Sequence, residues 1–145
     1  IISQRRLKIR NKIIATNQDC LNAMASKSRS LGLKTKVCSS INDDVSISAK
    51  KLVDIIKNDL SKKGVLICGS GIGMSISANR HKGIRAGLCN NPEMAELSRR
   101  HNDVNILVLP GRFIDVNTAK LCIDNFLNTD FEGDRHIKRI EKIDE

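Results

Sequence analysis

One stretch of the sequence, VLICGSGIGMS at residues 65–75, decides the fold expected of this 145-residue chain. Its first four residues are apolar and lie between glycines, which predicts a strand buried on both faces. Glycines at alternate positions follow, and then apolar residues at a spacing that begins a helix. A strand that leads through a glycine loop into a helix brings backbone N–H groups together around an anion. The stretch therefore predicts an anion site, with Cys68 beside it at the end of the strand.

The composition is that of one soluble globular domain. With three Phe and neither Tyr nor Trp, the chain lacks the aromatic platforms on which nucleic-acid bases stack. The net charge is +9, and basic residues crowd both ends of the chain. This excess indicates either an anionic partner or a solvated basic surface. No nucleic-acid partner is expected, because no recognised nucleic-acid-binding module is present.

The cysteines and the apolar segments indicate where the protein works. There are five scattered cysteines, with neither a CxxC motif nor Cys/His spacing typical of zinc. No apolar run reaches the length of a membrane span, and none resembles a secretory segment. We therefore expect no metal, no disulfide framework, no membrane partner and a reduced, cytoplasmic location. The cysteines are Cys20, Cys38, Cys68, Cys89 and Cys122.

Hydrophobic periodicity predicts five strands that alternate with helices. This alternation is typical of a parallel sheet with right-handed crossovers and helices on both faces. The expected fold class is α/β: a single three-layer α/β/α domain with a doubly wound, five-stranded, Rossmann/flavodoxin-like parallel sheet and a C-terminal helix. Residues 1–11 are expected to form a basic leader, and residues 12–145 the domain. The predicted strands are 12–16, 33–38, 65–68, 84–89 and 106–109, and the predicted helices are 17–30, 47–60, 74–79, 92–101, 116–127 and a last one after residue 133.

In doubly wound sheets, ligands bind beyond the carboxyl ends of the strands, where the strand order reverses. If the order is flavodoxin-like, that point lies between the first and third strands. The loops at residues 16–18 and 68–70 would then face each other.

The motifs along the chain closely resemble those of the ribose-5-phosphate isomerase B family. Its sugar-phosphate isomerase relatives, including galactose-6-phosphate isomerases, share much of this pattern. The likeness covers nearly everything after residue 11. It is carried by residues 68–76, 78–79, 83–86, 89, 100–103, 105, 111–112, 126–127, 131–133, 135–136 and 139.

The resemblance implies interconversion of an aldose phosphate, ribose 5-phosphate, and a ketose phosphate, ribulose 5-phosphate, in the pentose phosphate pathway. The reaction passes through a cis-enediolate, and neither a metal nor an organic cofactor is implied. Such chemistry needs a base beside C1 and C2, and donors for the developing oxyanion. It also needs a cationic cradle for the phosphate, for which arginine is well suited.

The resemblance also assigns roles to the residues around the glycine loop. Cys68 matches the family's catalytic cysteine, which moves the proton between the two carbons. A thiol near a helix N-terminus and a cationic site can serve as a base. The hydroxyl and amides that hold the enediolate oxygens would come from Ser70, Gly69, Gly71, Ile72 and Gly73.

Further matches lie towards the C-terminus. His101 matches the residue that opens the furanose ring, and Asn102 matches a substrate-binding amide. Arg135 and Arg139 match phosphate arginines, and their spacing of four puts them on one face of a helix. Arg112 matches a phosphate arginine contributed by the neighbouring subunit. The resemblance thus implies a homodimer, or a tetramer, whose active sites are shared between subunits.

The first loop departs from the family pattern. Asn17 and Gln18 stand where the family normally has Asp-His. Both are expected to contact substrate, and they keep a similar shape and hydrogen-bonding capacity but lose titratable charge. This departure leaves two alternatives open: an isomerase of another sugar phosphate, such as a hexose 6-phosphate, or a non-catalytic sugar-phosphate binding protein.

Overall fold

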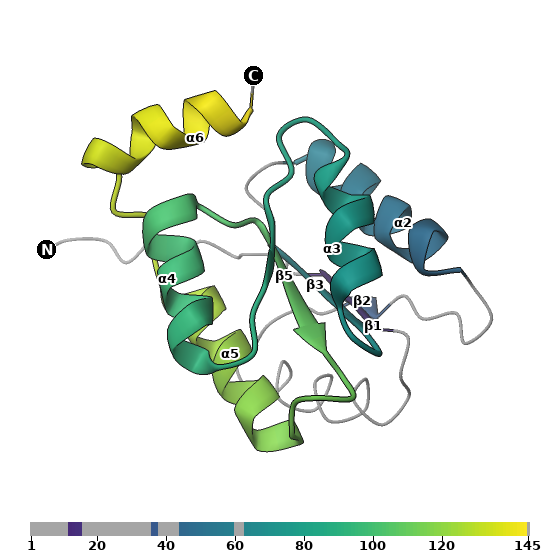
Figure 1. Cartoon of the computed structure of the whole chain (residues 1–145). Coiled ribbons are helices and arrows are strands. Elements are labelled where there is room, and N and C mark those ends of the chain that lie inside the picture. Colours follow the sequence, from purple (N-terminus) through teal and green to yellow (C-terminus); the bar gives the residue numbers. More distant parts are fainter. Residues whose placement is uncertain (1–11, 16–35, 38–43, 60–62, 145) are drawn as a thin grey trace, which may run out of the picture.

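A computed structural model describes residues 12–15, 36–37, 44–59 and 63–144 of the chain. The predicted leader, the predicted helix 17–30 and the candidate residues Asn17 and Gln18 lie outside the described residues. The predicted parallel sheet with helices on both faces is confirmed (Figure 1). Its strands are β1 Lys12–Ala15, β2 Lys36–Val37, β3 Gly64–Cys68, β4 Ala86–Leu88 and β5 Ile106–Pro110.

The strand order is β2-β1-β3-β5-β4, and all neighbours are parallel. A flavodoxin-like order would place β4 beside β3, whereas here β5 lies beside β3 and β4 forms the edge. The difference follows burial, because all five residues of β5 are buried and β4 is short and partly exposed. The reversal between β1 and β3 is kept, so the Cys68 loop still lies where a ligand is expected.

The helices begin where polar caps or glycine allow. α2 starts two residues before the predicted helix 47–60, because the Asp44 side chain accepts a hydrogen bond from the amide of Ser46. Asn91 caps α4 and Asp115 caps α5 in the same way. α3 begins two residues earlier than predicted, directly after Gly71. The helices are α2 Val45–Lys57, α3 Ile72–Asn79, α4 Pro92–Asn102, α5 Val116–Asn128 and α6 Ile137–Ile143, with a 3-10 turn η1 at Asp134–His136.

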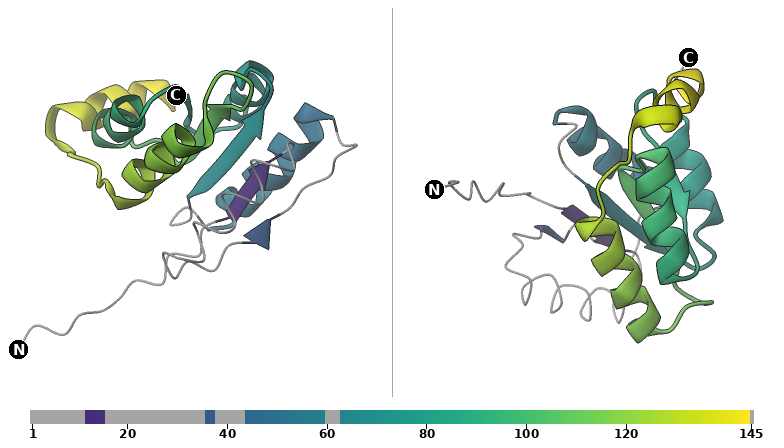
Figure 2. Two further views of the ribbon diagram at one scale, coloured as in Figure 1. Left: turned by 90° about the horizontal axis from the view of Figure 1, so that it is seen from below. Right: turned by 90° about the vertical axis from the view of Figure 1, so that its left-hand side faces the viewer.

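Two apolar cores lie on opposite faces of the sheet, because successive residues of β3 point to opposite sides. Val65 and Ile67 pack in the core that contains α4 and α5 residues, such as Phe126. Leu66 and Cys68 pack in the core that contains α2 and α3 residues. Figure 2 shows the two helix layers on either side of the sheet. Each fully buried large apolar side chain stabilises this arrangement by about 1.5–3 kcal/mol.

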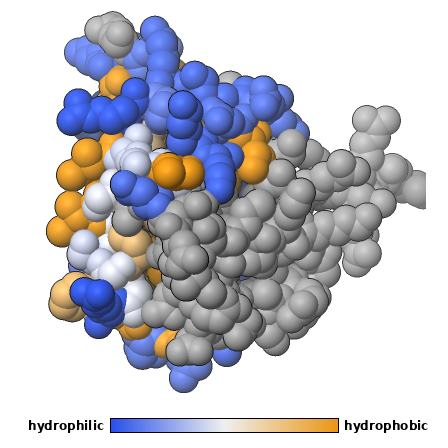
Figure 3. Space-filling model, turned by 90° about the vertical axis from the view of Figure 1, so that its right-hand side faces the viewer, coloured by the Kyte–Doolittle hydropathy of each residue, from blue (hydrophilic) through white to orange (hydrophobic). Residues whose placement is uncertain are grey.

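The C-terminal helix α6 packs less closely than the others. Ile137 and Ile143 of this helix are 46% and 60% exposed. α6 lies beyond the amino ends of the strands, beside the end of α4 (Figure 1). Exposed apolar side chains also gather along one edge of the face in Figure 3. Among the described helices, none combines the length and the apolar character that crossing a bilayer requires.

Candidate active site

The Cys68 loop lies at the carboxyl end of β3. The Cys68 side chain is buried, and its Sγ accepts a hydrogen bond from the amide of Gly71 at 3.2 Å. Two backbone bonds join the loop to the end of β5: Gly111 N donates to Cys68 O at 2.8 Å, and Arg112 N donates to Gly69 O at 3.0 Å. Main-chain contacts from Gly71 and from the end of β5 therefore hold the Cys68 loop at the carboxyl end of the central strand β3.

Gly71 is the residue that shapes this loop. It has φ of +77°, and a Cβ added to it would lie 2.5 Å from Cδ1 of Leu88. Ser70 directly precedes Gly71 in this turn, and its Oγ accepts a hydrogen bond from the amide of Ile72 at 3.3 Å. Because Gly71 offers no side chain to cap α3, the amides of Gly73 and Met74 in its first turn can bind an anion. The predicted loop residues therefore lie together, as strand, turn and helix start.

Arg112 lies against this loop of its own chain. A Cβ on Gly69 would lie 3.3 Å from Nε of Arg112, so the guanidinium side chain covers that glycine. The Arg112 side chain is otherwise exposed. One positive charge is thus available beside the glycine loop. That Arg112 serves a neighbouring subunit's site stays a prediction.

A second polar group lies at the end of α4, and we call His101, Glu132 and His136 the histidine–glutamate group. The two imidazole rings are stacked, with centroids 4.5 Å apart and planes 10° apart. Oε2 of Glu132 lies 3.7 Å from Nε2 of each histidine. The ligand-type atoms of the three residues all lie within 4.8 Å of one another. The group is therefore the one place among the described residues where such side chains could share a metal ion.

Charge and burial set the protonation of this group. Nε of Arg100 donates to Oε1 of Glu132 at 2.6 Å, and this hydrogen bond lowers the pKa of Glu132. Burial lowers the pKa of His136, and the charges of His101, Arg135 and Arg139 lower it further, against an opposing effect of Glu132. His136 is only 3% exposed. At neutral pH it is therefore an uncharged imidazole next to a carboxylate.

Arg135 and Arg139 lie around the same imidazole. Arg135 belongs to η1 and Arg139 to α6, so their spacing of four runs from a 3-10 turn into a helix. Nε of Arg135 lies 3.4 Å from Nε2 of His136. Both arginine side chains are exposed. The structure thus brings His101, Arg135 and Arg139 together, as a cationic surface over His136.

The two groups of predicted residues are separated within one chain. α4 begins after the carboxyl end of β4 and runs for 11 residues, about 16 Å, back towards the amino ends of the strands. His101 and Asn102 end that helix, whereas Cys68 lies at the carboxyl end of β3. Figures 1 and 2 show this opposite placement. A single chain therefore does not bring Cys68 and His101 together.

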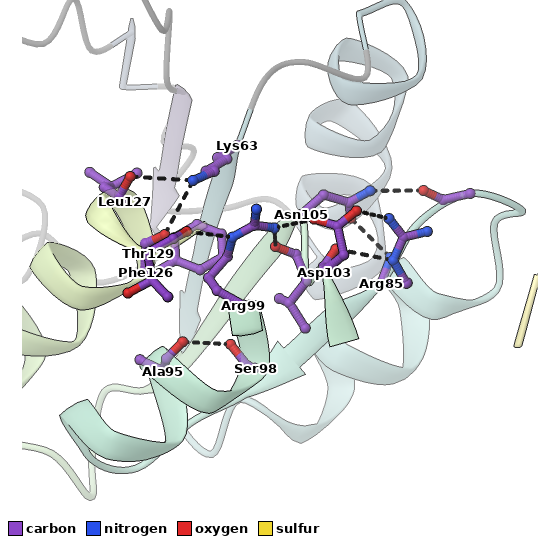
Figure 4. A network of polar contacts seen from close by, with 12 residues as sticks. Lys63, Arg85, Ala95, Ser98, Arg99, Asp103, Asn105, Phe126, Leu127 and Thr129 are labelled. Atoms are coloured by element: carbon purple, nitrogen blue, oxygen red, sulfur yellow. Dashed lines mark hydrogen bonds and ion pairs between the residues drawn. The ribbon is translucent and has the colours of Figure 1, made fainter. Parts of the chain in front are cut away.

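A buried polar network holds the end of α4 in place (Figure 4). Arg99 is 6% exposed and donates to Oδ1 of Asp103 at 2.7 Å and to the carbonyl of Val104 at 2.6 Å. Arg85 pairs with the other oxygen of Asp103 at 2.9 Å and with Asp144 at 2.8 Å. Asp103 itself ends α4 in the left-handed conformation. The network ties the residue before β4, the end of α4 and the residue after α6 together, two residues beyond His101 in the chain.

Sequence reasoning missed two members of the site. Glu132 and His136 were recognised only as parts of the family pattern and not as candidate site residues. Their spacing of four, next to Arg135, was an available signal. The sequence gives no such signal for their contact with His101, since this contact joins segments more than 30 residues apart.

Comparison with known proteins identifies the family of the chain. The sequence matches the family described as Ribose/Galactose Isomerase over residues 12–143. The chain belongs to this family. A ribose-5-phosphate isomerase B of Escherichia coli is 48% identical over 80 residues, which cover 55% of this chain and 54% of that protein. A Rickettsia conorii protein, named provisionally as a sugar phosphate isomerase, is 53% identical over 95 residues, 66% of either protein.

Solved structures of the ribose/galactose isomerase family share the fold over almost the whole chain. A ribose 5-phosphate isomerase of Thermotoga maritima is 41% identical, has a TM-score of 0.87 and covers 92% of this chain and 97% of its own. Ribose-5-phosphate isomerase B of Mycoplasma genitalium, solved with bound ribulose-5-phosphate, is 32% identical with a TM-score of 0.85. It covers 92% of this chain and 94% of its own.

Proposed function

We propose that this protein is a sugar phosphate isomerase that interconverts ribose 5-phosphate and ribulose 5-phosphate. The observation that carries the proposal is the sulfur of Cys68, held 3.2 Å from a loop amide at the open end of α3. A proton-transfer base and a set of oxyanion donors side by side are what an enediolate reaction needs. Family membership supports the same conclusion.

In the proposed reaction, His101 opens the sugar ring by protonating the ring oxygen and accepting the proton of the O1 hydroxyl. The Cys68 thiolate removes the proton from C2 and forms the cis-enediolate. The same thiol then delivers the proton to C1, while a proton passes from O2 to O1. The amides of the Cys68 loop and the Ser70 hydroxyl stabilise the oxygens of the enediolate, where charge develops.

The separation of the two groups supports a site shared between two copies of the chain. One copy supplies Cys68 and its loop, and the other supplies His101 and Asn102 with Arg135 and Arg139. Phe113, in the loop after β5, is 76% exposed, and Ile72 and Ile76 of α3 are each 54% exposed. Large apolar side chains beside a half-site provide surface for a partner to cover. A homodimer, or a tetramer built from such dimers, would complete each site.

The first test is a direct isomerase assay with ribose 5-phosphate. Replacing Cys68 with alanine is expected to lower kcat at least ~100-fold, the usual contribution of a general base. Cys122→Ala is the matched control, because Cys122 is a buried thiol in the core on the opposite face of the sheet. Equal activity of Cys68→Ala and Cys122→Ala would exclude the proposed role of Cys68.

A second candidate substrate follows from Asn17 and Gln18, which replace the family's Asp-His. Neutral amides in the first loop favour a sugar phosphate with a different hydroxyl pattern, such as a hexose 6-phosphate. Turnover of five-carbon and six-carbon phosphates by the same preparation separates these substrates. Exchange of the C2 proton in deuterated water separates either isomerase from a protein that only binds sugar phosphates.

A further inference from the structure

The histidine–glutamate group has the ligand set and nearly the spacing of a zinc site. Two histidine nitrogens and one carboxylate oxygen form the His2Glu set, which leaves a fourth position open. With bonds of about 2.0–2.1 Å, ligand atoms around tetrahedral zinc lie roughly 3.4 Å apart. Oε2 of Glu132 lies 3.7 Å from Nε2 of His101 and of His136. The distances from Oε2 to the two nitrogens are therefore close to those of a zinc site.

Nε2 of His136 and the carboxylate of Glu132 both carry lone pairs that a metal ion can use. Nε of Arg135 donates to Nε2 of His136 at 3.4 Å, so Nε2 is the unprotonated nitrogen, and a metal ion bound there would replace this hydrogen bond. The nearest atom of Glu132 is a carboxylate oxygen, which also carries lone pairs.

The rings can turn to accept a metal ion. The ion must lie in the plane of each imidazole, whereas the two rings are now stacked with planes 10° apart. The His101 side chain is 35% exposed, so it can rotate towards solvent and back. His136 is buried, but its Nδ1 has no hydrogen-bond partner among the described residues. No Nδ1 hydrogen bond to those residues therefore opposes rotation of the ring.

The neighbouring arginines orient the carboxylate of Glu132 and limit the affinity of the group for a metal ion. Arg100 holds Oε1 of Glu132, which orients Oε2 towards the histidines as an outer-shell partner does. Arg100, Arg135 and Arg139 bring positive charge from α4, η1 and α6, and they oppose a bound cation. The same charges favour an anion at the open fourth position. The expected site is therefore one of reversible binding.

We propose that His101, Glu132 and His136 together bind one Zn²⁺ ion, and that the bound ion inhibits the enzyme by occupying Nε2 of His101. Zinc suits this ligand set better than Mg²⁺ or Ca²⁺, which prefer oxygen. The ion is an inhibitor here and has no part in the isomerisation. The inhibition rests on the proposed function, whereas the binding of zinc does not.

The binding test uses the full chain, freed of metal by a chelator and titrated with Zn²⁺ by calorimetry. One ion per chain is expected, and His101→Gln and His136→Gln should each weaken binding at least ~10-fold. His81→Gln is the matched control, because it removes the only other histidine of the sequence. Unchanged affinity in the two variants, or no binding by the wild type, would overturn the proposal. If the buried His136 variant fails to fold, the exposed His101 variant still decides the outcome.

Cobalt separates this site from binding to cysteine. Co²⁺ bound to nitrogen and oxygen gives visible d–d bands, and a thiolate ligand adds an intense charge-transfer band in the near ultraviolet. We expect the d–d bands without the thiolate band, and their loss in His101→Gln. A thiolate band that survives in His101→Gln would place the metal on a cysteine and overturn the proposal.

The isomerase assay then tests inhibition. Zn²⁺ should lower the wild-type rate and lower it at least ~10-fold less effectively in His136→Gln. Equal sensitivity of the two proteins would contradict the inhibitory role. A chain that binds zinc as expected but isomerises no sugar phosphate would contradict the proposed function alone. An active isomerase that binds no zinc would contradict this inference alone.

Discussion

The Cys68 loop and the histidine–glutamate group differ in what holds them in place. Main-chain hydrogen bonds join the Cys68 loop to the end of β5, and the shape of Gly71 fixes its turn. The histidine–glutamate group is held by side chains, through the ion pair of Arg100 with Glu132 and through stacked rings. Backbone contacts resist substitution and pH, whereas ion pairs depend on both. The comparison therefore predicts which half of the site is sensitive to which change.

The largest expected effect comes from the network that supports the end of α4. Asp103→Ala leaves the buried guanidinium of Arg99 without its carboxylate, which should lower the free energy of unfolding by about 3 kcal/mol. Urea unfolding followed by far-ultraviolet circular dichroism measures this, because the chain has neither Trp nor Tyr for fluorescence. Glu141→Ala, on the exposed side of α6, is the control and should change stability by less than about 0.5 kcal/mol. Equal stability of the two variants would show that the network does not support α4.

The next largest effect tests whether packing around Gly71 fixes the turn of the Cys68 loop. Gly71→Ala adds a Cβ 2.5 Å from Leu88 at φ of +77°. Gly83→Ala has the same strain at φ of +78°, but nothing among the described residues lies within 4 Å of its added Cβ. We expect Gly71→Ala to cost about 2 kcal/mol more than Gly83→Ala, through overpacking alone. Similar unfolding midpoints for both would mean that the loop relaxes freely and that packing does not fix its turn.

The smallest effect is a change in the titration of His136. The pKa of His136 in an NMR titration should lie below the ordinary value of 6.5. Glu132→Gln should lower that pKa further, since the carboxylate opposes the shift. The unfolded chain then binds more protons than the folded one between the two pKa values. Stability should therefore rise with pH through that window and level off above about 6.5. His81→Gln serves to assign the resonances, and an upward shift in Glu132→Gln would contradict the proposed electrostatics.

Local pattern was enough to predict the strand, glycine turn and helix start around Cys68. The reason is that neighbouring residues determine burial, turn and helix start there. β4 was predicted at residues 84–89 but spans only Ala86–Leu88. The amide of Ile84 donates to the turn at His81 instead, although the amide of Cys89 still donates to Val108 of β5. The flavodoxin-like order was wrong for the last two strands. Periodicity describes each strand alone and carries no information on which strand lies beside it.

The sequence by itself determined the alternating elements, the family pattern and the chemistry available at Cys68, because each depends on residues close together in the chain. Only the tertiary structure decided that β5 lies beside β3, that His101 stacks on His136, and that Glu132 lies between them. It also decided that Cys68 and His101 lie at opposite ends of the sheet. These relations join segments distant in sequence, and they are set by the burial of whole strands and helices rather than by any local pattern.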